Sequence, residues 1–100
     1  MNYLIRHKPQ AGEDIDKILD YIEYELLNPI AAERFARGLD AKIDQLRFNA
    51  DIFAISTYKY VLKYDVAARH VLYKGFAIIY SIYGNLVIIH RVVHGSLIKE

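Results

Sequence analysis

Apolar residues in the first half of the chain recur with the period of an α-helix. A first stripe falls at i, i+3, i+4, i+7 and i+11, on Ile15, Ile18, Leu19, Ile22 and Leu26. A second stripe lies on Ala32, Phe35, Leu39, Ile43 and Leu46. Between the stripes, Asn28 suits a helix N-cap and Pro29 suits the first helical position. The pattern predicts two helices, the first starting at Gly12 or Glu13, that form a tight antiparallel hairpin.

The second predicted helix has Gly38 in its interior. Glycine at such a position costs about 1 kcal/mol relative to alanine. We expect Gly38 to allow another part of the backbone to approach this helix closely.

The second half of the chain changes to segments typical of β-strands. A short first strand is predicted over Tyr3–His7, stopped by Pro9, and three more over Arg69–Tyr73, Phe76–Tyr83 and Leu86–His94. Lys74-Gly75 and Gly84-Asn85 separate the last three strands. Glycine followed by asparagine fits a type II′ turn, which pairs Tyr83 with Leu86.

Counting inward from that turn gives a regular ladder for the last two strands. The ladder places Ile79 opposite His90 and Ala77 opposite Val92. Arg91 and His94 then lie on opposite faces of the sheet, and Ala77 shares the face of His94. Both faces are largely apolar, so these strands are expected to be covered on at least one side.

The order of elements predicts an α+β fold over residues 1–100 as one domain: a two-layer sandwich with the order β-α-α-β-β-β. An N-terminal strand and a three-stranded antiparallel meander complete one sheet, and the helical hairpin covers a face of it. The segment Thr57–Tyr64 alternates poorly and is expected to be an extended edge or a loop. The last residues, Leu97–Glu100, are expected to be a frayed or partner-seeking tail.

The composition indicates in which compartment the protein is expected and what kind of partner it favours. Hydrophobic residues make up 54% of the chain and charged residues 25%, which indicates a folded globular protein. The sequence has no cysteine, no signal peptide and no apolar run that could span a membrane, so we expect a cytoplasmic protein. Residues 51–100 hold 6 Lys/Arg against 3 Asp/Glu. This basic bias mildly favours an anionic partner, and imbalances of this size also arise by chance.

Spacing along the sequence excludes several kinds of active site. His90 and His94 lie four strand residues apart, roughly 13 Å, which is too far to share a metal. No glycine-rich phosphate loop is present, and no nucleophile–base pair is evident. We therefore expect neither a metal nor a cofactor.

A loose group of polar residues remains near one end of the predicted sheet: Arg69, Lys74, Arg91 and His94. These residues could bind a phosphate, with His94 as general acid or base. Alternatively, Arg69 and Arg91 pair with carboxylates such as Asp65, and His94 caps a strand end. The tyrosines at positions 58, 60, 64 and 73 allow a similar choice, between stacking on bases and packing against the sheet.

The order of motifs resembles the RelE/ParE toxin superfamily of bacterial type II toxin–antitoxin (plasmid stabilisation) modules. The matching features are Ala11, Asp14-Ile15, Ile18 and Tyr21 in the first helix, a second helix ending near Leu46, and the runs Arg69–Tyr80 and Val87–Gly95. The resemblance implies a toxin whose hydrophobic grooves are wrapped by a cognate antitoxin. It leaves two targets open, since one fold hosts different activities.

Relatives of the RelE branch cut mRNA in the ribosome, whereas relatives of the ParE branch inhibit DNA gyrase and are not known as nucleases. The resemblance assigns Arg69 and Arg91 to phosphate binding and His94 to proton transfer if the chain is a ribosome-dependent nuclease. Nuclease relatives commonly have arginine where this chain has Ala77, and a basic residue where it has Ser96-Leu97. We therefore favour the ParE-like function, which is not enzymatic. A non-toxic relative that still binds an antitoxin is a third alternative.

Overall fold

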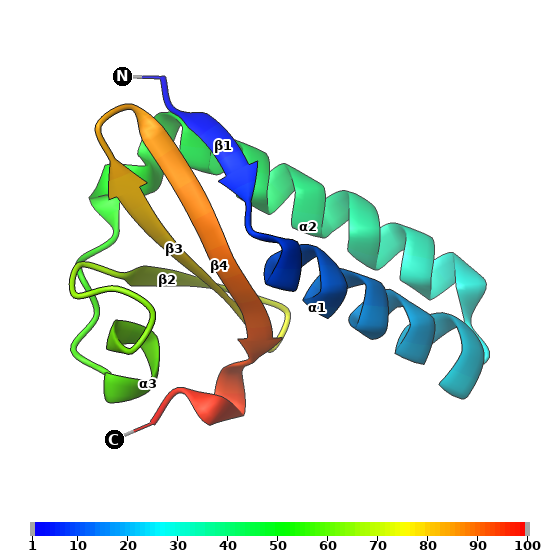
Figure 1. The fold of residues 1–100 in the computed structure, drawn as a ribbon. Coiled ribbons are helices and arrows are strands. Elements are labelled where there is room, and N and C mark those ends of the chain that lie inside the picture. Colours follow the sequence, from blue (N-terminus) through cyan, green and yellow to red (C-terminus); the bar gives the residue numbers. More distant parts are fainter. Residues whose placement is uncertain (1, 100) are drawn as a thin grey trace.

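Four strands form one mixed sheet in the order β1-β4-β3-β2 in the computed structural model, which describes residues 2–99 (Figure 1). Their bounds are Leu4–His7 for β1, Arg69–Tyr73 for β2, Phe76–Tyr83 for β3 and Leu86–His94 for β4. Strand β1 runs parallel to β4, and the other neighbours are antiparallel. The predicted α+β fold, with an N-terminal strand, two helices and a three-stranded meander, is confirmed.

The helical hairpin consists of α1 (Pro9–Asp20), which continues as a π-helix η1 (Tyr21–Glu25), and α2 (Pro29–Asn49). The predicted cap is confirmed, because the Asn28 side chain accepts a hydrogen bond from the Ala31 N–H at 3.0 Å. All five predicted apolar positions of α2 are buried. Helix α1 starts earlier than predicted, at Pro9, whose fixed φ is suited to a first helical turn.

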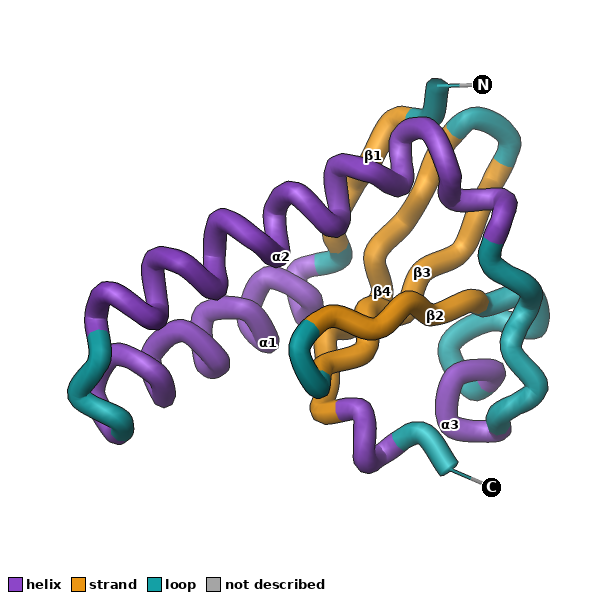
Figure 2. The backbone as a smooth tube through the Cα atoms, turned by 180° about the vertical axis from the view of Figure 1, so that it is seen from behind, coloured by secondary structure: helices purple, strands orange, loops and turns teal. Residues whose placement is uncertain are grey.

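The far end of the hairpin extends beyond the sheet (Figure 2). Leu26, predicted to lie on the buried stripe, is therefore exposed, as are Tyr24 and Ile30. Leu27 follows in the left-handed conformation with φ +52°, and the Asn28 N–H bonds the Ile22 carbonyl at 3.2 Å. This bond reaches one residue further back than in a Schellman cap, because it follows the wider π-helix η1, and the left-handed position at such helix ends is usually glycine. The leucine side chain is 81% exposed.

Gly38 in α2 faces Tyr73 of β2. A Cβ atom built on Gly38 would lie 1.9 Å from the Tyr73 hydroxyl oxygen, so no larger residue fits without a shift. The predicted close approach is thus present, but a side chain makes it, not the backbone. Phe35 packs edge-on against the same tyrosine ring, with centroids 5.3 Å apart.

The ladder between β3 and β4 is regular only near its turn. Tyr83 pairs with Leu86 as predicted, and Gly84 has φ +60°. Further along, the neighbours Ile79 and Tyr80 pair with Arg91 and Ile89, so His90 is an extra residue in β4, a β-bulge.

Beyond the bulge the predicted pairing is wrong by one residue. Ala77 pairs with Val93 and Phe76 pairs with His94. Phe76 packs among the residues under the helical hairpin, whereas Ala77 and Val93 belong to a second cluster on the other face. His94 therefore lies on the hairpin face, and the prediction that it shares a face with Ala77 is wrong. Arg91 and His94 do lie on opposite faces.

The second face of the sheet is covered by elements that the sequence pattern did not indicate. The segment Thr57–Tyr64, expected to be an extended edge or a loop, contains a short helix, α3 (Lys59–Leu62), and η2 (Ala50–Ile52) precedes it at the end of α2. Helix α3 buries Val61 in the second cluster, whose members are Val61, Ala68, Ala77, Ile79 and Val93. The C-terminal segment is not wholly frayed, because η3 (Gly95–Leu97) is ordered and Ile98 packs against this cluster. Glu100 lies outside the described residues.

Candidate functional site

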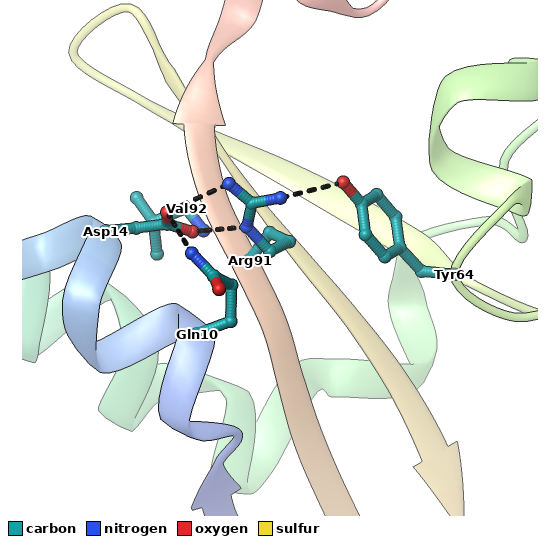
Figure 3. A network of polar contacts seen from close by, with 5 residues as sticks. All are labelled: Gln10, Asp14, Tyr64, Arg91 and Val92. Atoms are coloured by element: carbon teal, nitrogen blue, oxygen red, sulfur yellow. Dashed lines mark hydrogen bonds and ion pairs between the residues drawn. The ribbon is translucent and has the colours of Figure 1, made fainter.

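Asp14 of α1 and Arg91 of β4 form the centre of a polar network at the edge of the sheet (Figure 3). The two carboxylate oxygens accept hydrogen bonds from Arg91 Nε at 2.7 Å and Nη2 at 3.0 Å. This two-point contact is the strong, planar form of a carboxylate–guanidinium pair. Gln10 adds a longer contact to Asp14 at 3.5 Å.

The same carboxylate also completes the edge of β4. Strand β1 ends at His7, so the Val92 N–H points outward beyond the last β1 partner. Asp14 accepts a hydrogen bond from this N–H at 3.0 Å. Burial alone would raise the pKa of Asp14, but the hydrogen bonds from Arg91 and Val92, with the Arg91 charge, hold it below its usual value. Asp14 is thus a buried, ionised carboxylate.

Arg91 is held from its other side by Tyr64, whose hydroxyl accepts a hydrogen bond from Nη1 at 3.1 Å. Bonding to Asp14 raises the pKa of Arg91 further above its ordinary value. The expectation that Arg91 pairs with a carboxylate is confirmed, but the partner is Asp14, not Asp65. Asp14 and Arg91 are 77 positions apart, so no local spacing in the sequence indicates the pair.

Arg69 is engaged with the backbone. Its guanidinium donates to the Asp51 carbonyl at 3.3 Å and to the Phe53 carbonyl. These bonds tie the start of β2 to the segment after α2. The alternative prediction of a carboxylate partner for Arg69 is therefore wrong.

His94 is exposed at the end of β4 and bonded to the following turn. Its Nδ1 accepts a hydrogen bond from the Ser96 N–H at 3.1 Å and lies 2.6 Å from the Ser96 hydroxyl. The capping contact predicted as an alternative is confirmed. The His94 ring also lies edge-on to Phe76, with centroids 5.6 Å apart.

The structure does not bring Arg69, Arg91 and His94 together. Arg69 pairs with Tyr80 and His94 with Phe76, four residues apart along β3, or roughly 13 Å at the rise of a strand. Arg91 projects from the opposite face, since it pairs with Ile79 of the second cluster. Lys74 lies in the β2–β3 turn, with its Nζ 5.6 Å from the centroid of the Tyr73 ring.

The bulge residue His90 is buried, with 2% of its surface exposed. Its Nε2 lies 2.8 Å from the Ser81 hydroxyl, and its ring stacks on Tyr64 with centroids 6.2 Å apart. Burial lowers the pKa of His90, so the ring is neutral at pH 7. This buried Ser–His pair has no access to a substrate, and we assign it a packing role.

The four tyrosines considered for base stacking pack against the two clusters instead. Tyr58, Tyr60 and Tyr64 contact the second cluster, and Tyr73 contacts the core under the hairpin. The packing alternative is confirmed for all four.

An apolar groove of about 370 Å³ lies between the hairpin and the start of β3. Its lining residues are Lys17, Ile18, Tyr21, Ile22, Leu26 and Phe76. Tyr21 and Leu26 are exposed in this groove, whereas Ile18, Ile22 and Phe76 form its partly buried floor against the core. An apolar surface of this kind fits a protein partner better than a polar substrate.

Other kinds of site are not evident in the described part of the chain. No three His, Asp or Glu side chains between residues 2 and 99 are grouped as metal ligands. No helix in the same range is long and apolar enough to cross a membrane.

Comparisons with known proteins agree with this architecture. The model for the family described as the ParE toxin of type II toxin-antitoxin system, parDE, matches residues 5–98. A solved structure described as the chromosomal ParDE TA system from P. aeruginosa is similar with a TM-score of 0.75 at 18% identity, over 92% of this chain and 95% of that one, a likeness of fold. No curated protein matches the sequence. Since the family model spans nearly the whole chain, this protein belongs to the ParE toxin family of type II toxin–antitoxin systems.

Proposed function

We propose that the protein inhibits DNA gyrase through protein–protein contact in the cytoplasm and is neutralised by a cognate ParD antitoxin. The observation that carries the choice of target is the separation of Arg69, Arg91 and His94. Acid–base cleavage of a phosphodiester needs its groups within hydrogen-bond reach of one reacting centre. Both arginines are also engaged, Arg91 with Asp14 and Arg69 with backbone carbonyls.

The position of Ala77 supports the same choice. Its side chain is fully buried in the second cluster, on the face opposite His94. A phosphate could not reach it without displacing α3. An arginine at position 77 would itself lie on the face opposite His94, so this position supplies no phosphate-binding group beside His94.

A gyrase assay tests this proposal directly. Purified protein at excess is expected to inhibit supercoiling and to trap DNA breaks, and His94→Ala is expected to inhibit equally. Absence of both effects would rule out gyrase as the target.

Ribosome-dependent mRNA cleavage is the competing function, carried by His94 with Arg69 and Arg91. Primer extension on mRNA after induction would then show cuts at the ribosomal A site, and His94→Ala would abolish them. If expression of the protein does not arrest growth, the chain is a non-toxic relative that binds an antitoxin.

We propose that the antitoxin covers the apolar groove beside Phe76 and the exposed end of the hairpin. A helix with an apolar face fits such a surface, because it replaces water along the groove without leaving polar groups unpaired. Leu26→Glu is expected to weaken antitoxin binding at least about tenfold, measured by calorimetry, since it places a charge in the groove. Ile52→Glu is the matched control, because Ile52 is also exposed but lies in η2, at the other end of α2. Equal loss in both variants would exclude the groove as the binding surface.

A further inference from the structure

A second groove runs along the outer edge of β1, away from the apolar groove described above. It has a volume of about 500 Å³ and lies between β1 and the side of α2. From β1 it is lined by Ile5 and His7, and from α2 by Asp40, Ala41, Ile43, Asp44 and Arg47. It differs from the first groove in having a strand edge as one wall and carboxylates on the other.

The strand edge presents unpaired backbone groups to this groove. Leu4 and Lys8 donate their N–H groups to β4, to the carbonyls of Asn85 and Ile89, at 2.8 and 3.0 Å. Backbone groups of alternate residues in a strand point in opposite directions, so those of Ile5 and His7 point away from β4. Strand β1 is terminal in the sheet, and no strand among residues 2–99 pairs with this edge.

Helix α2 sets the length of the open edge. The Tyr3 N–H, which also points outward, donates to the Arg47 carbonyl at 2.8 Å, so α2 closes the groove at that end. At the other end the chain turns into α1 at Pro9. The open edge therefore spans Leu4–His7, which accommodates an added segment of about four residues.

The opposite wall carries a net negative charge. Asp44 is bonded to Arg47 at 2.6 Å. Asp40, one turn earlier on α2, makes no ion pair with any residue in the range 2–99. Beneath them, Ile43 and Ile5 give the groove an apolar floor. Nucleic acid is disfavoured here, because its phosphates would face a carboxylate.

We propose that this groove binds an extended polypeptide segment that adds to β1 as a fifth strand and places a lysine or arginine against Asp40. Strand addition supplies main-chain hydrogen bonds from Ile5 and His7, and the wall formed by α2 selects the side chain. The occupant is a basic peptide segment of a partner protein. The proposal does not depend on the gyrase target, since it is argued from this groove alone.

The test uses the full-length, ¹⁵N-labelled protein and a capped peptide, Val-Lys-Val-Lys-Val. Titration is expected to shift the amide signals of Ile5 and His7 and to leave those of the apolar groove beside Phe76 unchanged. His7→Pro removes one outward N–H without removing a bond to β4, and is expected to weaken binding at least about tenfold. His7→Ala keeps that N–H and is expected to bind within about twofold of the parent protein.

Substitutions that remove one charge test whether Asp40, on the wall formed by α2, selects a basic side chain. Asp40→Asn is expected to weaken binding of the lysine peptide about fivefold, but not that of the matched glutamine peptide, Val-Gln-Val-Gln-Val. Asp16→Asn, on the exposed side of α1, is the control for net charge and is expected to change neither affinity.

The proposal is overturned if the amides of Ile5 and His7 do not move, or if His7→Pro and His7→Ala bind alike. Should His7→Pro fail to fold, as judged by its amide spectrum, a peptide methylated at alternate backbone nitrogens replaces it. That peptide cannot donate to the Ile5 or His7 carbonyls. Unimpaired binding of the methylated peptide also overturns the proposal.

Discussion

Asp14 joins helix α1 to strand β4 through both of its carboxylate oxygens. This one side chain accepts hydrogen bonds from the Arg91 guanidinium and from the Val92 N–H. Without Asp14, the Val92 N–H would lie unpaired at the edge of the sheet. Leaving a largely buried charge without its partner costs more than the pair itself contributes. The Asp14 carboxylate is therefore a site where a small chemical change is expected to have a large effect on stability.

We predict that Asp14→Asn lowers the free energy of unfolding by about 2 kcal/mol at pH 7, because Arg91 loses its charged partner. The pKa of Asp14 is depressed in the folded protein, so its contribution is present above the unfolded value of 3.8 and is lost as the pH falls through the folded pKa. Urea denaturation should therefore show that the free energies of unfolding of the parent protein and of Asp14→Asn converge below about pH 4. Asp16→Asn on the same helix should change stability little at any pH. A pH-independent difference would contradict the assignment.

The buried His90 is expected to make the stability of the protein depend on pH in a second, higher pH range. Burial, aided by the charge of Lys8 and opposed by Asp65, lowers the pKa of this imidazole in the folded state. The unfolded chain then binds more protons below about pH 6.5, so stability falls as the pH drops from 7 toward 5.

His90→Gln is expected to reduce that fall, measured as the free energy of unfolding at pH 7 and pH 5. Burial also lowers the pKa of His70, so part of the slope remains until His70 is replaced as well. An unchanged slope in the His90 variant would show that the imidazole is not buried in solution.

At the scale of elements, Gly38 sets how closely α2 approaches β2. Alanine at an open helix position gains up to about 1 kcal/mol over glycine. At Gly38 the added methyl group would overlap the Tyr73 hydroxyl, and overpacking of this kind costs about 1–3 kcal/mol.

We therefore predict that Gly38→Ala lowers the thermal midpoint, whereas Gly12→Ala raises it. Gly12 is the matched control, because it lies within α1 and a Cβ there meets no atom within 4 Å. Adding Tyr73→Phe removes the closest overlapping atom, the hydroxyl oxygen, and should recover part of the Gly38→Ala loss, while the ring carbon Cζ at 2.8 Å still crowds the methyl group. Additive effects of the two substitutions would indicate that the contact is absent.

The elements that the sequence predicted are those whose determinants are local. Asn28 and Pro29 specify a helix start by their own chemistry, and Gly84 supplies the φ that the β3–β4 turn requires. The five-residue stripe of α2 is long enough for its period to identify the buried face. Each of these predictions rests on residues within a single element or turn.

The missed features depend on tertiary contacts. Helix α3 is only four residues long, too short to show a period. The bulge at His90 adds one residue to an apolar strand, and both registers bury apolar side chains. Asp14 resembles the other acidic residues of α1, and only the contact with Arg91 distinguishes it. The sequence pattern therefore singles out Arg91 as a site residue but not its pairing with Asp14.

At the scale of the whole molecule, the hairpin makes the particle elongated, with extents of 40 × 31 × 21 Å. Its far end exposes four large apolar side chains, Tyr24, Leu26, Leu27 and Ile30. Burying this surface against a partner is favourable, and in the absence of the partner it favours self-association.

We predict that the protein without its antitoxin self-associates as its concentration rises, measured by light scattering after size exclusion. The double variant Leu27→Lys, Ile30→Lys should remain monomeric, because charges then interrupt the apolar end of the hairpin. Val66→Lys is the control, since Val66 is 88% exposed and lies in the loop before β2. Equal suppression by Val66→Lys would attribute the effect to net charge alone.

The bulge at His90 shifts the alternation of side chains between the two faces of β4 by one residue. Every residue after it points to the face that an uninterrupted strand would assign to its neighbour. If β4 kept the same length without the bulge, His94 would lie on the face of Ala77 and Arg91 on the face of the helical hairpin. A relative with a regular last strand would thus present the equivalent of His94 to a different surface, even if the two sequences align without a gap. One inserted residue in β4 therefore decides on which face of the sheet the end of that strand presents its side chains.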